Sequence, residues 1–372
     1  MGVGRGEVYP AGRGVSKAML VPPTRSRLLL TGTLMALAGP VALAVAASSA
    51  ARPATSVPWR GPRPGGTWTR TSLTLQANAL IAEPSRLGVV FAGTVDGVWR
   101  SDDGGLRWAR AGSGLHGNTI VALALAPADD TLYAGSDDGA VYEMATRQAG
   151  HWRRVSASLN GTPVFSLAVG PGRRPALLAG TIGALYRGWA GGSGWRWQRV
   201  AQTGQAAISS IVWLPAHAGS ALAAVFGVSP AVLATRDGGR TWVADAGGLP
   251  SVLPTHTLLP VGPQQPSTIL TTMGGGVWER AAGGTWHEIS AGLPARHAMA
   301  LVALPGSGTR MLYAGTMGDG VYVKQAAVPW RSLGHGLLGT ENTILSLAVV
   351  SGSPPGLLAG TALGVYRYAP PR

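Results

Sequence analysis

Four acidic residues lie in short loop sequences where a pair of carboxylates could perform acid–base chemistry. Asp96, Asp138 and Asp319 belong to the sequences V-D-G, D-D-G and G-D-G, and Glu341 lies in a later loop. Hydrolysis of a glycosidic bond requires two carboxyl groups on either side of the scissile bond. The same sequences are also ordinary turns, because Asp hydrogen-bonds to nearby backbone and Gly adopts positive φ. We therefore expect turn formation first, with a glycoside hydrolase as the alternative function.

Other residues typical of catalytic or metal centres occur without the spacing that such centres need. The seven histidines lack metal-ligand spacing, and the sequence contains no cysteine, no P-loop and no H-E-x-x-H motif. Polar residues that we expect in loops around a central channel are His116, Asn118, Asn160, Gln205, His256, His297, His335 and Asn342. We predict no metal site, no cofactor and no catalytic residue.

Arginine recurs at two positions of a repeat that tryptophan marks. Two residues after a recurring tryptophan lie Arg70, Arg110, Arg154 and Arg199, and at the end of a G-V-W/Y-x motif lie Arg100, Arg187 and Arg367. The other three repeats have no arginine at either position. Charge on edge strands opposes aggregation, but this does not explain its confinement to consecutive repeats. Because arginine pairs well with carboxylates and phosphates, we predict that these seven residues form a binding surface, the basic rim arc, for an acidic protein face or anionic headgroups.

Seven tryptophans define the repeat that must position these residues. They are Trp68, Trp108, Trp152, Trp197, Trp242, Trp286 and Trp330, at intervals of 40 to 45 residues. Each repeat also holds an aliphatic strand pattern, an A-G-T-like strand and a G-V-W/Y-like strand, separated by turn residues. Four short β runs with this period are typical of a propeller blade. The sequence predicts an all-β fold, a seven-bladed β-propeller of four-stranded blades.

The ends of the repeat region predict how the ring closes. The last repeat supplies three strands and stops at Tyr368, whereas the strand of Trp68 (67–72) precedes the first complete repeat. We expect this early strand to pair with the C-terminal one and complete the last blade. The pairing would remove an open sheet edge. Since each blade contacts only its neighbours, it would also stabilise the whole ring.

Two repeats carry a complete Ser/Thr-x-Asp-x-Gly-x-x-Trp motif, which we call the Asp-box motif. Its residues are Ser101, Asp103, Gly105 and Trp108 in one repeat and Thr235, Asp237, Gly239 and Trp242 in another. The Asp side chain can accept backbone N–H bonds in a hairpin turn, Gly supplies positive φ, and Trp packs beneath. By this motif, the region from about residue 67 to 369 resembles the Asp-box, or BNR-repeat, propellers, which include sialidases, sortilin-type receptors, xyloglucanases and photosystem II assembly factors. The resemblance implies a structural role for the motif, at the periphery.

The resemblance also narrows the choice of function. Sialidases have six blades and need three arginines directed at the substrate, whereas the inner strand patterns here contain essentially no arginine, with Arg296 at best at the mouth of one. Xyloglucanases join two propellers around a cleft, and this sequence carries one. A single seven-bladed domain with an export segment looks most like the photosystem II assembly factor branch. That similarity implies a binding or assembly role.

The N-terminal region has the features of an export segment. Residues 1–27 form a basic segment with five Lys/Arg and one Glu, and residues 28–47 form an uncharged apolar run. Such a run can span a bilayer with its positive flank inside, and the small residues after it offer cleavage sites. A retained transmembrane anchor and a cleaved signal peptide both stay open, and a buried core helix is a third reading. A linker over 48–66 would then lead to the propeller over 67–372.

These features together predict a scaffold. Residues 1–64 hold eight Lys/Arg and one Glu, which is half of the net charge of +14, so the basic composition is a weak sign of nucleic-acid binding. We expect a non-catalytic, monomeric propeller, secreted or membrane-anchored on the extracytoplasmic side. It would dock a protein partner or the membrane surface and would not bind nucleic acid.

Overall fold

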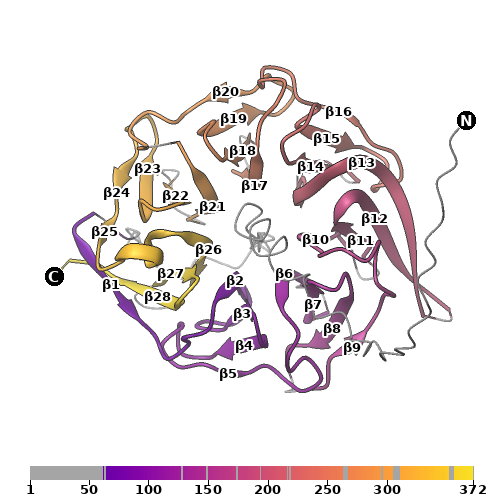
Figure 1. Ribbon diagram of the computed structural model, residues 1–372, viewed down its shortest axis with the longest axis horizontal. Helices are drawn as coiled ribbons and strands as arrows, with labels where there is room; N and C mark the ends of the chain where they lie inside the picture. The colour runs from indigo at the N-terminus through magenta and orange to yellow at the C-terminus, as the bar shows by residue number, and fades with distance from the viewer. Residues whose placement is uncertain are drawn as a thin grey trace, which may run out of the picture. The chain divides into compact units, whose positions relative to one another are not determined.

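The protein is an all-β propeller over the part of the chain that the structure describes. This computed structural model describes residues 62, 64–126, 129–147, 150–172, 175–192, 194–215, 217, 219–262, 267–294, 296–304, 311–351 and 356–371. The sheets follow one another in chain order around a ring (Figure 1). The predicted basic segment, the apolar run 28–47 and most of the linker lie outside the described residues. Within the described residues, no helix has the length and apolar composition needed to cross a membrane.

Four of the sheets have four strands each. The first two consist of β2 (Ala77–Ala82), β3 (Val90–Thr94), β4 (Gly97–Ser101) and β5 (Ala109–Arg110), and of β6 (Ile120–Ala126), β7 (Thr131–Ser136), β8 (Val141–Ala145) and β9 (Arg153–Arg154). The other two consist of β17 (Thr255–Val261), β18 (Ser267–Thr272), β19 (Val277–Ala281) and β20 (His287–Glu288), and of β21 (Ala298–Ala303), β22 (Met311–Thr316), β23 (Val321–Gln325) and β24 (Arg331–Ser332).

The remaining two sheets are larger. One has five strands in the order β25 (Gly334–His335), β1 (Gly66–Arg70), β28 (Gly364–Ala369), β27 (Gly356–Thr361) and β26 (Ile344–Val350). The other has seven strands, β10 (Ser166–Val169), β11 (Leu177–Gly180), β12 (Ile182–Gly191), β13 (Gly194–Trp213), β14 (Ala221–Val225), β15 (Val232–Thr235) and β16 (Val243–Ala244). A short 3-10 helix, η1 (Gly339–Asn342), precedes β26.

The expectation of seven separate four-stranded blades is corrected by these sheets. Five of them are separate blades, and residues 166–244 instead form one continuous sheet of seven strands. The cause is β13, which runs unbroken through the position where other repeats leave one blade and enter the next. Its residues pair with β12 as far as Ala207, and from Ile208 onwards they pair with β14.

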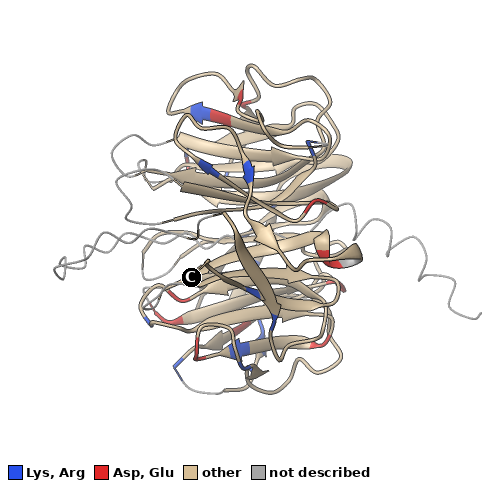
Figure 2. Ribbon diagram, turned by 90° about the vertical axis from the view of Figure 1, so that its left-hand side faces the viewer, with Lys and Arg blue, Asp and Glu red and all other residues tan. Residues whose placement is uncertain are grey.

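The core lies between neighbouring sheets, which explains the uncharged inner strands. In β6 the sequence IVALALA is almost completely buried. One core cluster joins Phe91 of β3 to Ile120 and Leu132 of the next sheet, with Trp152 packed against them. Because both sides of an inner strand face other sheets, a charge there would lose its hydration. Accordingly, the ribbon segments coloured for charged residues in Figure 2 lie mainly on outer strands and turns.

The predicted pairing of the Trp68 strand with the C-terminal strand is confirmed. β1 lies antiparallel to β28, with Trp68 opposite Tyr368 and Arg70 opposite Tyr366. The Tyr368 hydroxyl accepts a hydrogen bond from the Gly66 N–H at 2.7 Å and donates one to the Leu333 carbonyl at 2.8 Å. The rings of Trp68 and Tyr368 lie 5.2 Å apart, and both side chains are buried. The first and last strands therefore share one packed, hydrogen-bonded joint.

Candidate functional site

Asp96 is held by three partners in the turn between β3 and β4. Its carboxylate pairs with the Arg110 guanidinium, accepts the Gly117 N–H at 2.8 Å and lies 2.9 Å from Nδ1 of His116. The hydrogen bond from Arg110, followed by that from Gly117, lowers the pKa of Asp96 to about 2. Such a carboxylate stays ionised and is a poor proton donor, so its geometry fits a structural role.

The titration of Asp96 tests this assignment. In the folded protein we expect its carboxyl to titrate near pH 2, and the Arg110→Ala variant should move the midpoint up towards the ordinary aspartate pKa of 3.8. Because the folded pKa is depressed, the stabilisation that it reports is present above about pH 4 and is lost as the pH falls towards 2. Carboxyl chemical shifts followed by NMR measure the midpoint. An Arg331→Ala control should leave it unchanged, and an unaltered midpoint in Arg110→Ala would contradict the assignment.

The other three candidate carboxylates lie in separate turns. Asp138 binds the Ser136 hydroxyl and accepts the Ala140 N–H at 3.2 Å. Glu341 accepts a hydrogen bond from the Tyr366 hydroxyl. Asp319 is exposed at the tip of the turn between β22 and β23. The Asn342 carbonyl accepts the N–H groups of both Gly318 and Gly320, at 3.2 and 3.0 Å, so the loops of Asp319 and Glu341 adjoin.

His256 differs from the expected loop position. It lies in the inner strand β17, is completely buried, and packs edge-on against Phe226 with ring centroids 5.6 Å apart. Burial lowers its pKa to about 4, because the imidazolium cannot be hydrated there. His256 is therefore a neutral core side chain at ordinary pH. Among the described residues, no group of three His, Asp or Glu side chains is arranged to hold a metal ion.

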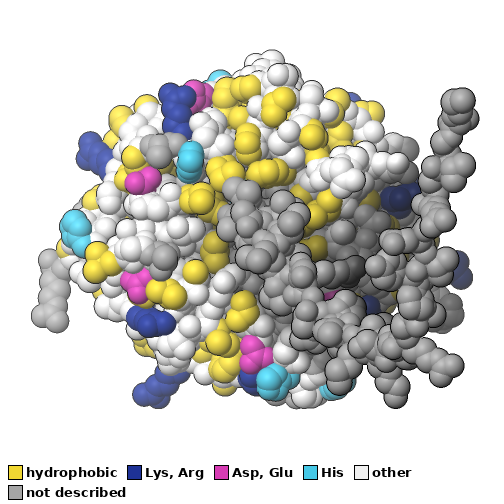
Figure 3. All heavy atoms as spheres, in the orientation of Figure 1, with side chains coloured by type: hydrophobic (Ala, Val, Ile, Leu, Met, Phe, Trp, Pro, Cys, Tyr) yellow, Lys and Arg dark blue, Asp and Glu magenta, His cyan; other side chains and the backbone are white. Residues whose placement is uncertain are grey.

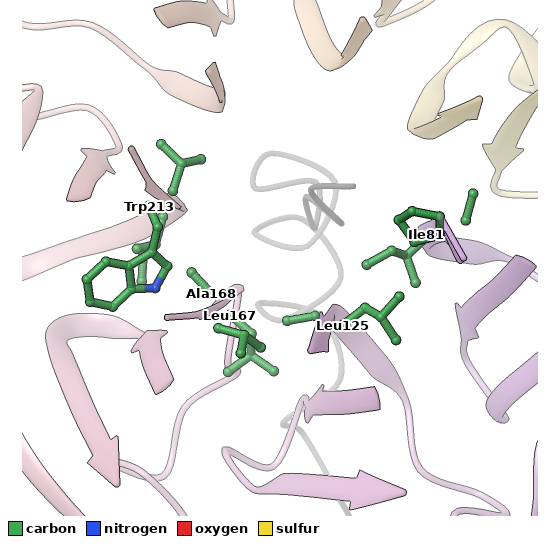
Figure 4. A pocket seen from close by; sticks show the side chains of 11 residues that line it. Ile81, Leu125, Leu167, Ala168 and Trp213 are labelled. Carbon is green, nitrogen blue, oxygen red and sulfur yellow. The ribbon is translucent and has the colours of Figure 1, made fainter. Parts of the chain in front are cut away.

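One apolar hollow lies where the inner strands β2, β6, β10 and β13 end. Figure 4 shows five of its lining residues, Ile81, Leu125, Leu167, Ala168 and Trp213. Its volume of about 60 Å³ is far below the several hundred Å³ of a typical small-molecule site. No charged side chain belongs to its lining. This hollow therefore lacks both the size and the polar groups for sugar hydrolysis.

Four arginines of the basic rim arc share one structural setting. Arg70, Arg110, Arg154 and Arg199 lie on the outer strands β1, β5, β9 and β13, directly opposite Tyr366, Trp99, Tyr142 and Tyr186, respectively. Directly opposed residues of an antiparallel pair point to the same side of the sheet. The Arg110 guanidinium stands 5.1 Å from the Trp99 ring centroid, in cation–π contact. The recurrence of arginine at this position thus coincides with an aromatic neighbour.

The other three arginines of the arc contact the next repeat. Arg100 donates to the Thr146 carbonyl at 2.8 Å, Arg187 to the Gly238 carbonyl at 2.8 Å, and Arg367 to the Gly104 carbonyl at 3.2 Å. Each acceptor lies in the turn that precedes the outer strand of the following repeat. These residues therefore join adjacent repeats through backbone carbonyls.

The structure places the two sets on opposite sides of their sheets. Arg110 pairs with Trp99 and Ala109 with Arg100, so the two arginines alternate in direction. Figure 3 shows one face of the molecule, on which hydrophobic side chains gather around the middle and Lys and Arg side chains lie near the perimeter. Arg70, Arg110, Arg154 and Arg199 are exposed on the fourth strands of their repeats, and we call these four the rim part of the arc. Of these four, Arg110 is neutralised by Asp96.

The Asp-box motifs form the closed turns that their residues predict. In the second motif, Asp237 accepts the N–H groups of Arg240 and Thr241 at 2.9 and 3.0 Å, and the Thr235 hydroxyl at 2.8 Å. Asp103 likewise accepts the N–H groups of Leu106 and Arg107, both at 3.0 Å. These bonds lower the pKa of both carboxyls against the opposing effect of burial. The Asp carboxylate and the Ser or Thr hydroxyl of each motif are thus used within the turn.

Gly239 of the second motif provides a stability test with a matched neighbour. Its φ is +82°, and an added Cβ would lie 2.6 Å from Cδ2 of Leu178 in the preceding repeat. At Gly238 the φ is +77°, but the nearest atom would be 3.5 Å away on the flexible Arg240 side chain. We expect Gly239→Ala to cost about 2–3 kcal/mol of unfolding free energy and Gly238→Ala about 1 kcal/mol. Urea denaturation measures both values, and equal losses would contradict the role of the Leu178 contact.

Six of the seven recurring tryptophans divide into two groups that the sequence did not distinguish. Trp108 and Trp242, in the complete motifs, donate their indole N–H to Gly105 and Gly239 of their own turn. The indole groups of Trp152, Trp197, Trp286 and Trp330 donate to carbonyls of the preceding repeat. These four tryptophans of incomplete motifs therefore connect repeats, whereas the buried indole N–H of Trp68 has no hydrogen-bond acceptor among the described residues.

The repeat pattern of the sequence does not predict the long hairpin of β12 and β13. It runs from Ile182 opposite Ala207 to Gly191 opposite Gly194, with register shifts between Ile182 and Ala184 and between Leu185 and Tyr186. Two additional tryptophans, Trp189 and Trp195, fall outside the repeated positions, and they are the sequence feature that could have indicated this hairpin. They lie in this hairpin, as does Arg196.

Comparisons with known proteins support the fold. No family model matches the sequence, and no curated protein matches it. Among solved structures, the protein is similar to the GH74 xyloglucanase from Xanthomonas campestris (TM-score 0.58, 20% identity, 81% of this chain and 53% of that one). It is also similar to an ancestral GH74 enzyme (TM-score 0.65, 16% identity, 85% and 46%) and to the WD40 propeller domain of Doa1 (TM-score 0.61, 12% identity, 82% and 98%). The chain spans about half the length of each GH74 enzyme. At these identities the likeness establishes a β-propeller.

Proposed function

We propose that this protein is a non-catalytic scaffold whose outer strands dock a partner protein. The observation that carries the proposal is the row of arginines on β1, β5, β9 and β13, each opposite an aromatic residue and near the rim. Arg154 and Arg199 have no carboxylate partner among the described residues. Exposed arginines that lack an internal counterion favour an acidic binding partner. Propellers of the WD40 kind are among its structural neighbours.

We also propose that the seven-stranded sheet counts as two blades, which gives seven in all. β13 exchanges its partner β12 for β14 at Ile208, and two recurring tryptophans, Trp197 and Trp242, fall in this sheet. With two complete motifs, this count supports membership of the Asp-box propellers, in the branch of assembly factors. We place residues 67–372 outside the cytoplasm, behind an anchor or signal at 28–47, because the charge and apolar length of the N-terminal region suit export.

The second candidate function is a glycoside hydrolase. It is favoured by the adjoining loops of Asp319 and Glu341 and by the GH74 neighbours. Against it, Glu341 is engaged by Tyr366, whose own pKa rises to about 12 through burial and this hydrogen bond. A carboxylate that is already fixed by a hydrogen bond within the last repeat is a weak candidate for a general acid.

Crosslinking in intact cells tests the scaffold against the enzyme. We expect the full chain to form a defined protein–protein crosslink from β9 or β13, and the double variant Arg154→Glu, Arg199→Glu to lose it. The matched variant Arg331→Glu, on β24 outside the arc, should retain it. Recovery of lipid alone would indicate a membrane surface instead. Release of reducing sugar from xyloglucan or another β-glucan, abolished by Asp319→Asn, would overturn the scaffold in favour of the hydrolase.

A further inference from the structure

The strand β13 has a long outer edge that no other strand of the described residues covers. Its residues 194–199 pair on one side with the segment from Gly191 to Tyr186 of β12. Its only other pairing, with β14, begins at Ile208. The outer strands β5, β9, β16, β20 and β24 have two residues each, and β1 is paired on both sides at Gly66 and Thr67. An edge of this length presents alternate N–H and C=O groups that can accept a further strand.

Packing on the sheet side holds this edge in place. Trp195 and Trp197 stack with ring centroids 6.0 Å apart, and Trp195 also meets Tyr133 edge-on at 5.8 Å. The Trp195 indole donates to the Glu143 carboxylate at 3.1 Å, and that of Trp197 to the Val155 carbonyl at 2.9 Å. These contacts fasten the hairpin to the preceding sheet. A strand that is already ordered binds a partner at a lower entropic cost than a loop does.

Arginine lies on both sides of this edge. Arg196 stands opposite Trp189 on one side of the hairpin, and Arg199 stands opposite Tyr186 on the other. Both side chains are exposed, and no described carboxylate lies within ion-pair distance of either. A strand added here would therefore meet a positive charge on each of its faces.

The sequence around the hairpin has no acidic residue to neutralise it. Between Glu143 and Asp237 the chain contains neither Asp nor Glu. The arginines of this stretch are Arg147, Arg153, Arg154, Arg173, Arg174, Arg187, Arg196, Arg199 and Arg236. Like charges on two facing edges repel each other, which disfavours pairing with a second copy of the same edge. The charge instead complements an acidic segment.

We propose that the outer edge of β13 binds an extended acidic segment of a partner protein as an additional β-strand. Backbone hydrogen bonds to residues 194–199 would supply affinity, and carboxylates on both faces of the segment would pair with Arg196 and Arg199. The proposal rests on the protein-binding function above and names its mode and the chemistry of the partner.

Two peptides of equal charge test strand addition. The first is Glu-Glu-Thr-Thr-Glu-Glu-Thr-Thr, which places carboxylates on both faces of an extended strand. The second has proline in place of each threonine and lacks those N–H donors. We expect the full chain to bind the first peptide about tenfold more tightly by calorimetry, since charge alone cannot distinguish them. Amide exchange within residues 194–199 should slow with the first peptide alone. Equal binding of the two peptides, or no binding of the first, would overturn the proposal.

Charge reversal separates this edge from the rest of the protein. The double variant Arg196→Glu, Arg199→Glu should weaken the first peptide about tenfold or more, while Arg331→Glu on β24 stays within about twofold of wild type. Melting curves must show that all three proteins remain folded. Suppose that the wild-type protein binds no peptide and that the in-cell protein crosslink persists in Arg196→Glu. This result would refute strand addition at β13 but not the proposed protein-binding function. Absence of any crosslink in wild type would refute the scaffold itself.

Discussion

Replacing Trp68 with alanine is expected to lower the free energy of unfolding by about 3–5 kcal/mol. The side chain is 3% exposed and lies in a cluster with Tyr313, Leu333 and Tyr368. Truncation would leave a cavity at the one joint that the first and last strands share. Chemical denaturation gives the loss. Amide exchange of β28 should accelerate more than that of β2, because β1 covers β28 directly.

The Trp108→Ala variant is the control for ring closure. Trp108 occupies the equivalent position on the next repeat, but it is half-buried and its indole bonds within its own turn. We expect a loss of about 1–2 kcal/mol there and no selective change in the exchange of β28. Similar losses in both variants, with β28 still protected in Trp68→Ala, would show that the closing strand contributes no more than any other.

Removing Asp245 is expected to cost about 2–4 kcal/mol, because it leaves a buried cation without its partner. Asp245 lies in the loop after β16, and its carboxylate is 2.6 Å from Nη1 of Arg280 on β19. Arg280 is 9% exposed, and its guanidinium stands 4.9 Å from the Trp286 ring centroid. Asp245→Ala would therefore leave the charge of the Arg280 guanidinium buried between two sheets without a partner. Thermal and urea unfolding both report the loss.

A double-mutant cycle separates this charge effect from lost packing. In an Arg280→Met background, Asp245→Ala should cost less than about 1 kcal/mol, since no unpaired guanidinium remains. The matched surface variant is Asp102→Ala, whose carboxylate pairs with Arg100 but is 66% exposed. We expect that change to cost less than about 1 kcal/mol. If Asp245→Ala lowers the free energy of unfolding as much in the Arg280→Met background as in wild type, the loss does not come from an unpaired Arg280 charge.

The repeat and its closure could be predicted from sequence because the spacing of tryptophan records them directly. The interval between Trp residues is the length of one supersecondary unit, and a strand left over at each end can only pair with the other. The Asp-box turns were equally readable, because Asp237 and Gly239 have side-chain or backbone properties that a hairpin turn needs.

The seven-stranded sheet could not be predicted by the same means. Spacing between Trp197 and Trp242 is as regular as elsewhere, yet β13 continues where other repeats turn. Whether a strand breaks at such a point depends on local turn chemistry, and Thr203 and Gly204 give no strong signal of either outcome. The extra tryptophans of the hairpin are visible in the sequence, but Tyr133, against which Trp195 packs, is distant in sequence.

The recurrence of arginine is visible in the sequence, but the sequence does not show which of these arginines face the same side of a sheet. Adjacent strand positions alternate between the two sides of a sheet, and the register between strands decides which residues face together. Without the register of β4 and β5, Arg100 and Arg110 look like neighbours, whereas they point in opposite directions. The sequence also gives no indication that the Thr146 carbonyl would accept a hydrogen bond from Arg100.

The joint between β1 and β28 has a consequence for synthesis on the ribosome. Residues 67–70 are synthesised long before their partners 366–369; Thr69 and Arg367, for example, are 298 residues apart in sequence. Until those partners are synthesised, Trp68 lacks the packing of β28, and the incomplete ring of blades exposes apolar residues at both of its open edges. Such a state is prone to association with other chains. A folding chaperone that shields this early strand would therefore raise the yield more than one that acts after release.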